Sequence, residues 1–250
     1  MIFELITIGI FVGTISGFFG VGGGMILIPL LITIGFNIKA AIAMSVVQMV
    51  FSSVYGSFMN YKKGNLVINE GIWVGIGGIL GAIIGSFFTE ILSERTLEYI
   101  FLALVSFALI KVATSKKLEN QEEKPLKPLI LFIIGFFIGI IAMMLGVGGS
   151  IMLTPILVGF FHFSTKKAAT AGLFFVVFSS ITGLIYKLIN HSFDKLDLNI
   201  EYALSVAIAS VIGVIIGIKL KDIVKDGHHK LFMLIMYAVI LFLFIKKMFF

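Results

Sequence analysis

Long uncharged apolar runs, separated by short polar stretches, dominate the chain. Six runs reach or approach the roughly 20 residues that cross the hydrocarbon core of a bilayer. They cover residues 5–38, 40–61, 71–89, 128–161, 168–186 and 202–218. Two shorter runs, 99–110 and 231–245, are flanked by charged residues whose long side chains can extend to the interface. Lipid gives the backbone no hydrogen-bonding partner and alternating strands are absent, so the pattern predicts membrane-spanning helices.

The run that opens each half of the chain is too long for one straight span. Residues 5–38 and 128–161 would each form a helix of about 51 Å at 1.5 Å per residue, against a hydrocarbon core of roughly 30 Å. A glycine cluster interrupts each run after about one span. We therefore predict a full span, a helix break and a short half-helix, with Pro29 and Pro155 limiting regular helix beyond the break.

The same motifs occur twice in the same order, which indicates a duplication. Residues 20–25 read GVGGGM and residues 146–151 read GVGGSI, and a proline follows each segment at the same distance. A Lys-Ala-Ala stretch begins at Lys39 and again at Lys167, and Phe-Ser-Ser begins at Phe51 and again at Phe178. The order never changes and the offset between the copies drifts by only a few residues.

The duplication predicts an all-α polytopic membrane protein with two homologous repeats of about four spans each. The first repeat covers residues 1–115, a charged linker covers 116–127, and the second repeat covers 128–250. The chain makes eight crossings, or has ten segments if each break is the tip of a hairpin. The second count agrees better with the positive-inside rule and makes the repeats inverted, so we prefer it. The sequence does not decide on which side of the membrane the termini lie.

Composition supports the membrane class and removes several functions. Hydrophobic residues make up 59% of the chain and charged residues 13%, which is far more apolar than a soluble domain. The net charge of +6 arises from basic residues in loops and tails, where they orient the protein toward the membrane surface and indicate no nucleic acid partner. Without cysteine there is no disulfide or thiolate metal site. The histidines lack metal-ligand spacing, and no phosphate-binding GxxxxGK[ST] loop is present.

The two glycine clusters are the strongest candidates for substrate binding. A helix break at membrane depth leaves backbone N–H groups without acceptors, and the half-helix that follows points its positive end toward them. Such a site attracts anions without a buried lysine. The candidate residues are Gly20, Gly22, Gly23 and Gly24 in the first half and Gly146, Gly148, Gly149 and Ser150 in the second. Other glycines at four-residue spacing, such as Gly77, Gly81 and Gly85, are typical of helix packing instead.

Polar side chains within the spans form a second group of candidates. Ser45, Gln48 and Ser52 share one helix face, which either lines a polar path or bonds back to its own helix. Thr170 and Ser179 are the candidates in the second half. Glu70 and Glu201 stand at the start of matching helices, where the helix dipole favours a carboxylate and a role in proton coupling is the alternative.

The duplicated glycine motif, its downstream proline and the Lys-Ala-Ala stretch after each copy resemble the sulfite exporter TauE/SafE family, also called TSUP transporters. The resemblance covers essentially the whole chain. It implies a plasma-membrane carrier of sulfur-containing or organic anions such as sulfite, sulfonates, thiosulfate or sulfoacetate. The family's glycine positions carry over to the two clusters, whereas Ser150 replaces a third glycine and Met143 replaces the counterpart of Gly17.

We therefore expect a secondary transporter of a small anion that works by alternating access, located in a prokaryotic plasma membrane and coupled to protons or to the membrane potential. Neither a cofactor nor a catalytic residue is expected. An anion channel is the nearest alternative, because a pore can use the same backbone amides. A membrane scaffold or an intramembrane enzyme is a further alternative, although neither explains two helix breaks. The sequence leaves the cargo, its direction and the oligomeric state open.

Overall fold

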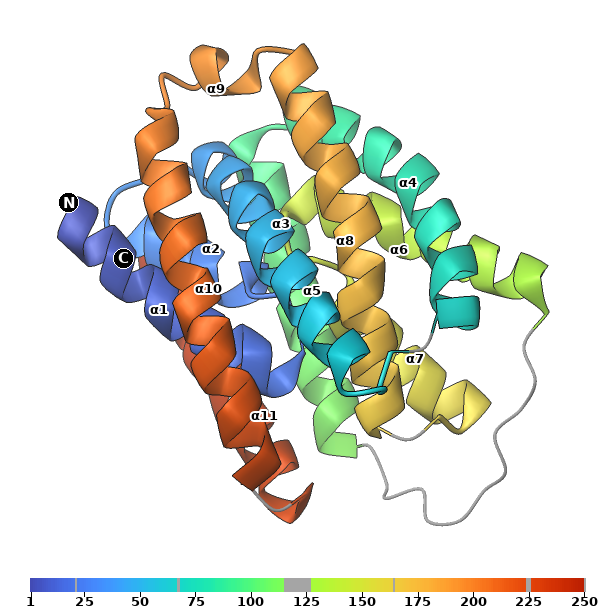
Figure 1. Cartoon of the computed structure of the whole chain (residues 1–250). Helices are drawn as coiled ribbons and strands as arrows, with labels where there is room; N and C mark the ends of the chain where they lie inside the picture. Colours follow the sequence, from blue (N-terminus) through green and yellow to red (C-terminus); the bar gives the residue numbers. More distant parts are fainter. Residues whose placement is uncertain (21, 67, 115–126, 164, 224–225, 250) are drawn as a thin grey trace.

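The computed structural model of the chain is helical throughout the residues that it describes, which are 1–20, 22–66, 68–114, 127–163, 165–223 and 226–249 (Figure 1). The helices are α1 (Ile2–Phe19), α2 (Gly24–Thr33), α3 (Ile38–Lys62), α4 (Ile68–Ile91), α5 (Glu94–Thr114), α6 (Pro128–Leu145), α7 (Ser150–Phe161), α8 (Thr165–Ile189), α9 (Ser192–Lys195), α10 (Ile200–Ile223) and α11 (Asp226–Phe249).

Seven of the helices within this part of the chain, α1, α3, α4, α5, α6, α8 and α10, are long and apolar enough to cross a membrane. The half-helices α2 and α7 are shorter but also apolar. These helices confirm the prediction of an all-α polytopic membrane protein. The predicted run 231–245 lies within α11, several of whose side chains are outside the described part. The predicted linker 116–127 lies outside the described residues except for Lys127.

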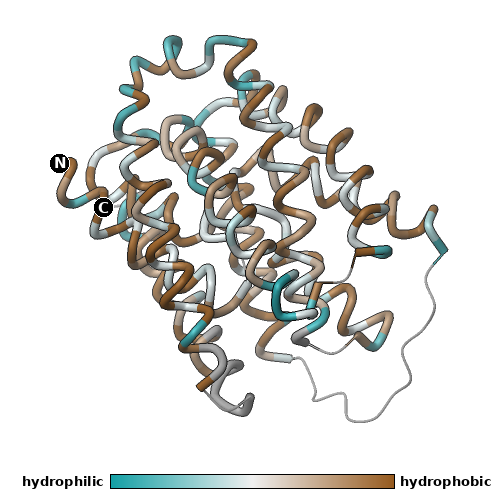
Figure 2. The backbone as a smooth tube through the Cα atoms, viewed as in Figure 1, coloured by the Kyte–Doolittle hydropathy of each residue, from teal (hydrophilic) through white to brown (hydrophobic). Residues whose placement is uncertain are grey.

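The outer surface is apolar along the helices. Figure 2 shows hydrophobic residues along the length of the bundle and hydrophilic residues gathered toward its ends, including the turn around α9. Large rings such as Phe107, Phe137 and Phe242 expose 54%, 60% and 66% of their surface. Lipid rather than water suits such a surface.

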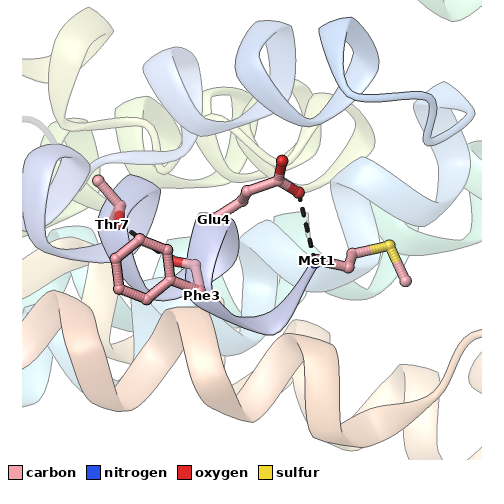
Figure 3. Close-up of polar contacts among 4 residues, drawn as sticks. All are labelled: Met1, Phe3, Glu4 and Thr7. Carbon is pink, nitrogen blue, oxygen red and sulfur yellow. Dashed lines mark hydrogen bonds and ion pairs between the residues drawn. The ribbon is translucent and has the colours of Figure 1, made fainter.

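The first helix begins with local polar contacts at its exposed start. The amino group of Met1 lies 3.5 Å from a carboxylate oxygen of Glu4, and the hydroxyl of Thr7 donates to the carbonyl of Phe3 at 2.9 Å (Figure 3). Glu4 also lies in the first helical turn, where the positive end of the helix dipole favours a carboxylate. These contacts fix the start of α1 without using any buried polar group.

Glycines bring two pairs of helices into close contact. Along α1, a Cβ added at Gly9, Gly13 or Gly17 would meet the backbone of Val206, Ser210 or Val214 on α10. Glycines of α4 meet the backbone of α6 in the same way, with Gly77 on Phe132, Gly81 on Phe136 and Gly85 on Ile140. Because the residue numbers rise together, both pairs run parallel (Figure 1). This confirms the packing role that was predicted for the regularly spaced glycines.

Polar contacts between helices define the two ends of the bundle. At one end, the Lys39 ammonium at the start of α3 donates to the carbonyl of Glu90 near the end of α4, and Ser192 of α9 donates to the Glu90 carboxylate. We call this end of the bundle the Glu90 end. At the other, the Lys167 ammonium near the start of α8 lies 3.9 Å from a carboxylate oxygen of Glu70 at the start of α4. This is the Glu70 end. Helix α3 therefore runs away from the Glu90 end, whereas α8 runs toward it.

These directions make each broken run a hairpin. Helix α10 begins after α9 at the Glu90 end, so its parallel partner α1 also runs away from that end, and α2 must return there because α3 begins there. Helix α6 is parallel to α4 and runs toward the Glu90 end, and α7 returns to the Glu70 end, where α8 begins. The two hairpins therefore open toward opposite ends.

Helices α3 and α8 lie at the centre. They are the most buried of the seven spans, with 72% and 61% of their apolar windows buried, and they pack on each other. Helix α3 also contacts α2 and α10, and α8 also contacts α7 and α4. Both glycine breaks therefore lie against the most enclosed helices.

The predicted role of the two prolines is wrong. Pro29 and Pro155 do not limit the half-helices but lie inside α2 and α7, which continue to Thr33 and Phe161. A proline removes only the hydrogen bond from its own nitrogen to the carbonyl four residues earlier, and in these helices that carbonyl lies in the first turn.

Candidate anion site at the hairpin tips

Both glycine clusters form sharp helix breaks, as predicted. Gly20 and Gly146 end α1 and α6 in the left-handed region, with φ of 71° and 64°. Gly23 and Gly149 precede α2 and α7 with φ of 77° and 58°. Only glycine adopts such angles without strain, so four residues of backbone reverse the chain at each tip. Gly24 and Ser150 are then the first residues of the half-helices.

The two tips touch. A Cβ added at Gly22 would lie 3.7 Å from the Cα of Gly148, and one added at Gly148 would lie 3.6 Å from the Cα of Gly22. Val176 of α8 lies against both glycines and Met49 of α3 lies against Gly148. The residues that the sequence places more than a hundred positions apart therefore form one site between α3 and α8.

The tips present hydrogen-bond donors for which the described residues supply no acceptor. Among the hydrogen bonds of the described residues, none is donated by the backbone N–H groups of Gly22, Gly23 and Gly24 or of Gly148 and Gly149. Buried backbone donors are nearly always paired in proteins, and those at a helix start carry the positive end of the helix dipole. Oxyanions carry acceptor atoms of the kind that such groups bind at helix starts.

Gln48 adds an amide to the first tip. Its side chain is fully buried, and neither its nitrogen nor its oxygen has a hydrogen-bond partner within the described part of the chain. Both atoms would lie 2.9 Å from a Cβ added at Gly23, so the amide rests directly on the glycine turn. A buried amide without partners costs roughly 1–3 kcal/mol. This cost is recovered when a ligand accepts from the amide.

The second tip differs from the first. Phe175 of α8 lies against Gly149, in the place that Gln48 of α3 takes against Gly23. Ser150 is fully buried and its hydroxyl also lacks a partner among the described residues. One tip therefore carries an amide and the other a ring and a hydroxyl, and the two tips are not chemically equivalent.

The remaining predicted polar residues have structural partners. Ser45 donates to the carbonyl of Gly146 at 2.7 Å, which fastens the second tip to α3. Ser52, Thr170 and Ser179 bond back to carbonyls of their own helices, at 3.3 Å, 2.8 Å and 3.3 Å. The structure thus brings Ser45 and Gln48 to the tips. The hydroxyls of Ser52, Thr170 and Ser179 bond to their own helices instead, which was the alternative to lining a polar path.

The two carboxylates considered for proton coupling begin α4 and α10. Glu70 faces Lys167, and the backbone N–H of Glu201 donates to the side chain of Asn199 at 2.8 Å. Both positions suit the helix dipole. Neither carboxylate touches the tips in the contacts given by the described residues.

A charged cluster at the Glu90 end was not predicted from the sequence. Lys187 of α8 exposes only 2% of its surface, although the sequence places it just past an apolar run, where a lysine normally extends to the interface. Glu90 ends the run of α4 in the same way. Both positions lie in the last turn of their helices, just past an apolar run, and this signal alone does not separate a buried charge from an interfacial one.

Comparisons with known proteins agree on one family. The family model described as sulfite exporter TauE/SafE matches residues 5–244. A protein of Methanocaldococcus jannaschii named a probable membrane transporter is 27% identical over 242 residues, which cover 91% of this chain and 89% of that protein. Two proteins of Bacillus subtilis with the same description, YunE and YjnA, are 21% and 24% identical and cover 74% and 86% of this chain, and 78% and 88% of their own lengths. No solved structure matches significantly.

Proposed function

We propose that this chain, which belongs to the sulfite exporter TauE/SafE family of membrane transporters, is a secondary transporter that binds a small anion at its two hairpin tips. The observation that carries the proposal is the set of buried donors without acceptors. These are the backbone N–H groups of the two glycine turns together with the amide of Gln48. Donors without a buried cation suit an anion that must bind and then leave.

The donors favour an oxyanion with several acceptor atoms. The two glycine turns meet at Gly22 and Gly148, so a tetrahedral or pyramidal anion bound between them would use more of their N–H groups than a spherical anion would. Together with the family's description, this favours a sulfur-containing anion such as sulfite, thiosulfate, a sulfonate or sulfoacetate. Gln48 supplies the one amide that distinguishes the first tip from the second.

We further infer that residues 1–115 and 128–250 are inverted repeats joined by the linker 116–127. Each half begins with a helix, a glycine turn and a half-helix, and α1 packs on α10 as α6 packs on α4. The central helices α3 and α8 begin at opposite ends of the bundle. Opposite directions of matching helices support an inverted plan, because parallel repeats would keep the same direction.

Alternating access follows from this plan. The two hairpins open toward opposite ends and meet at their tips, so a rocking motion between the halves exposes the site to one side and then to the other. A channel with the same tips is the alternative function. The two functions differ in exchange. At a membrane potential clamped to zero, proteoliposomes loaded with unlabelled anion accumulate labelled anion against its gradient through a carrier, whereas they do not through a channel.

Binding and transport are tested on the purified protein. Thermal stabilisation, which follows the ratio of anion concentration to Kd, is compared for a panel of anions at matched ionic strength. The panel contains sulfite, thiosulfate, sulfate, taurine, sulfoacetate, acetate and chloride. We expect one sulfur oxyanion to stabilise the protein and to exchange in proteoliposomes, with an imposed pH gradient reporting proton coupling. A stabilising anion whose effect survives substitution of both Gly23 and Gly149 would remove the basis for the site.

A further inference from the structure

The charged cluster at the Glu90 end joins four helices. Lys39 of α3 donates to the Glu90 backbone carbonyl at 2.9 Å, and Ser192 of α9 donates to the Glu90 carboxylate at 2.6 Å. Lys187 of α8 is buried beside them and interacts electrostatically with both Glu90 and Lys39. The cluster therefore contains two cations and one carboxylate, and its net charge is positive.

The ammonium of Lys187 has no direct partner among the described residues. None of their hydrogen bonds or ion pairs involves it, and Ser192 already occupies one oxygen of Glu90, the described carboxylate that acts on it. A buried ammonium that is neutralised only at a distance is costly, because burial removes its water. An anion that reaches Lys187 would lower this cost.

Buried polar positions connect the hairpin tips with Lys187. On α8, Ser179, Gly183 and Lys187 are four residues apart and so share one face. On α4, Ser86 lies four residues before Glu90, and a Cβ added at Gly183 would lie 3.5 Å from the hydroxyl oxygen of Ser86. The two faces are therefore in contact.

This connection starts at the tips. Ser179 lies one turn beyond Phe175 and Val176, which contact the glycine turns. Ser86 is fully buried and its hydroxyl has no partner within the described part of the chain. Between Ser179 and Lys187 the helix rises by about 12 Å. A small anion that left the tips toward the Glu90 end along these faces would meet the Ser86 hydroxyl and then Lys187.

We propose that Lys187 forms a second, transient anion-binding site between the hairpin tips and the Glu90 end, and that the Glu90 carboxylate competes with the transported anion for it. The proposal rests on the proposed function, and the ligand is the same class of small oxyanion. Lys187 attracts the anion from the tips. Glu90, held close by Ser192, limits how long the anion stays, because it offers the ammonium an alternative negative charge.

The other end of the bundle offers a matched control. Asn60 of α3 follows Phe51-Ser52-Ser53 at the same distance as Lys187 follows Phe178-Ser179-Ser180. It is neutral, and its amide nitrogen donates to the carbonyl of Gly56 at 2.9 Å. The position in the first repeat that matches Lys187 therefore carries no cation.

The test compares variants in proteoliposomes with labelled sulfite, or with the panel anion that stabilises the wild-type protein most. We expect Lys187→Met to lower kcat/KM about tenfold or more, the effect of losing one charge-assisted contact. Lys187→Arg should retain most of the activity, and Asn60→Met should change it little. Glu90→Gln should lower KM and kcat together, because the anion is held at Lys187 without its competitor. Stabilisation by the anion at the tips should persist in Lys187→Met.

A purely structural contact gives a different pattern. If Lys187 and Glu90 only hold the helices together, Lys187→Met and Glu90→Gln both lower the melting temperature, and both change KM in the same way, either raising it or leaving it unchanged. The double variant then has the same melting temperature and KM as each single variant. That result, or Lys187→Met with wild-type kinetics, overturns the second site while the proposed function stands. A wild-type protein that neither binds nor exchanges any anion of the panel overturns both.

Discussion

Replacing Gln48 by methionine should stabilise the empty protein and abolish anion binding. The amide is fully buried and both of its polar atoms lack partners, which costs roughly 1–3 kcal/mol without a ligand. Methionine has a similar length and no strong donor or acceptor, so most of this cost disappears. For a chain of this size, each kcal/mol corresponds to a rise of about 2–4 °C in melting temperature.

The same variant should lose the response to the anion. At an anion concentration of 100 times Kd, a binding site stabilises the wild-type protein by about 2.7 kcal/mol, and Gln48→Met should gain only a small fraction of this. Melting temperatures with and without the anion measure both effects. Ser52→Ala is the control, because Ser52 lies on the same helix face but its hydroxyl already bonds to Met49. A variant that melts below the wild type when empty, yet keeps the full response to the anion, would refute the reasoning.

Three further substitutions test the packing and the tips. Gly81→Ala should lower the melting temperature, because the added Cβ forces α4 away from the α6 backbone at a cost of about 1–3 kcal/mol. Gly159→Ala is the control, since a Cβ added there has nothing within 4 Å and should leave the melting temperature unchanged. Equal melting temperatures for the two variants would contradict the close packing of α4 on α6. Gly23→Ala should weaken anion binding, because its Cβ meets the Gln48 amide at 2.9 Å in addition to straining the backbone. Gly64→Ala is the control: Gly64 has a similar φ but lies in open space, so this variant should bind the anion as the wild type does. Ser45→Ala should cost about 0.5–1.5 kcal/mol of stability, since it loses the bond to Gly146, and an unchanged melting temperature would show that this bond does not hold the tip.

The spans and the breaks were predictable because each leaves a local signal. Uncharged length predicts a membrane helix, and contiguous glycines predict a reversal that no other residue adopts as easily. The prolines misled because their helix-breaking tendency depends on position. At Pro29 the lost hydrogen bond falls in the first turn of α2, where its absence does not end the helix.

Contacts between distant segments left no such signal. Gly9 and Gly77 stand in stripes of the same spacing, and nothing in the spacing assigns the first to α10 and the second to α6. The position of Gln48 at the first tip and of Phe175 at the second also depends on tertiary packing. Lys187 was missed because a charge just past an apolar run is ordinarily interfacial, and only the packing of α8 against α4 and α9 encloses it.

Each glycine-packed pair, α1 with α10 and α4 with α6, joins a helix of one half of the chain to a helix of the other half, and this affects how the protein is assembled during synthesis. Helix α1 is synthesised well before its partner α10, and α4 likewise precedes α6. Until synthesis nears its end, the glycine face of α1 is covered only by lipid or by assisting proteins. Two separately produced halves would each lack the partner of their first helix, and only their joint insertion into one membrane would rebuild the bundle.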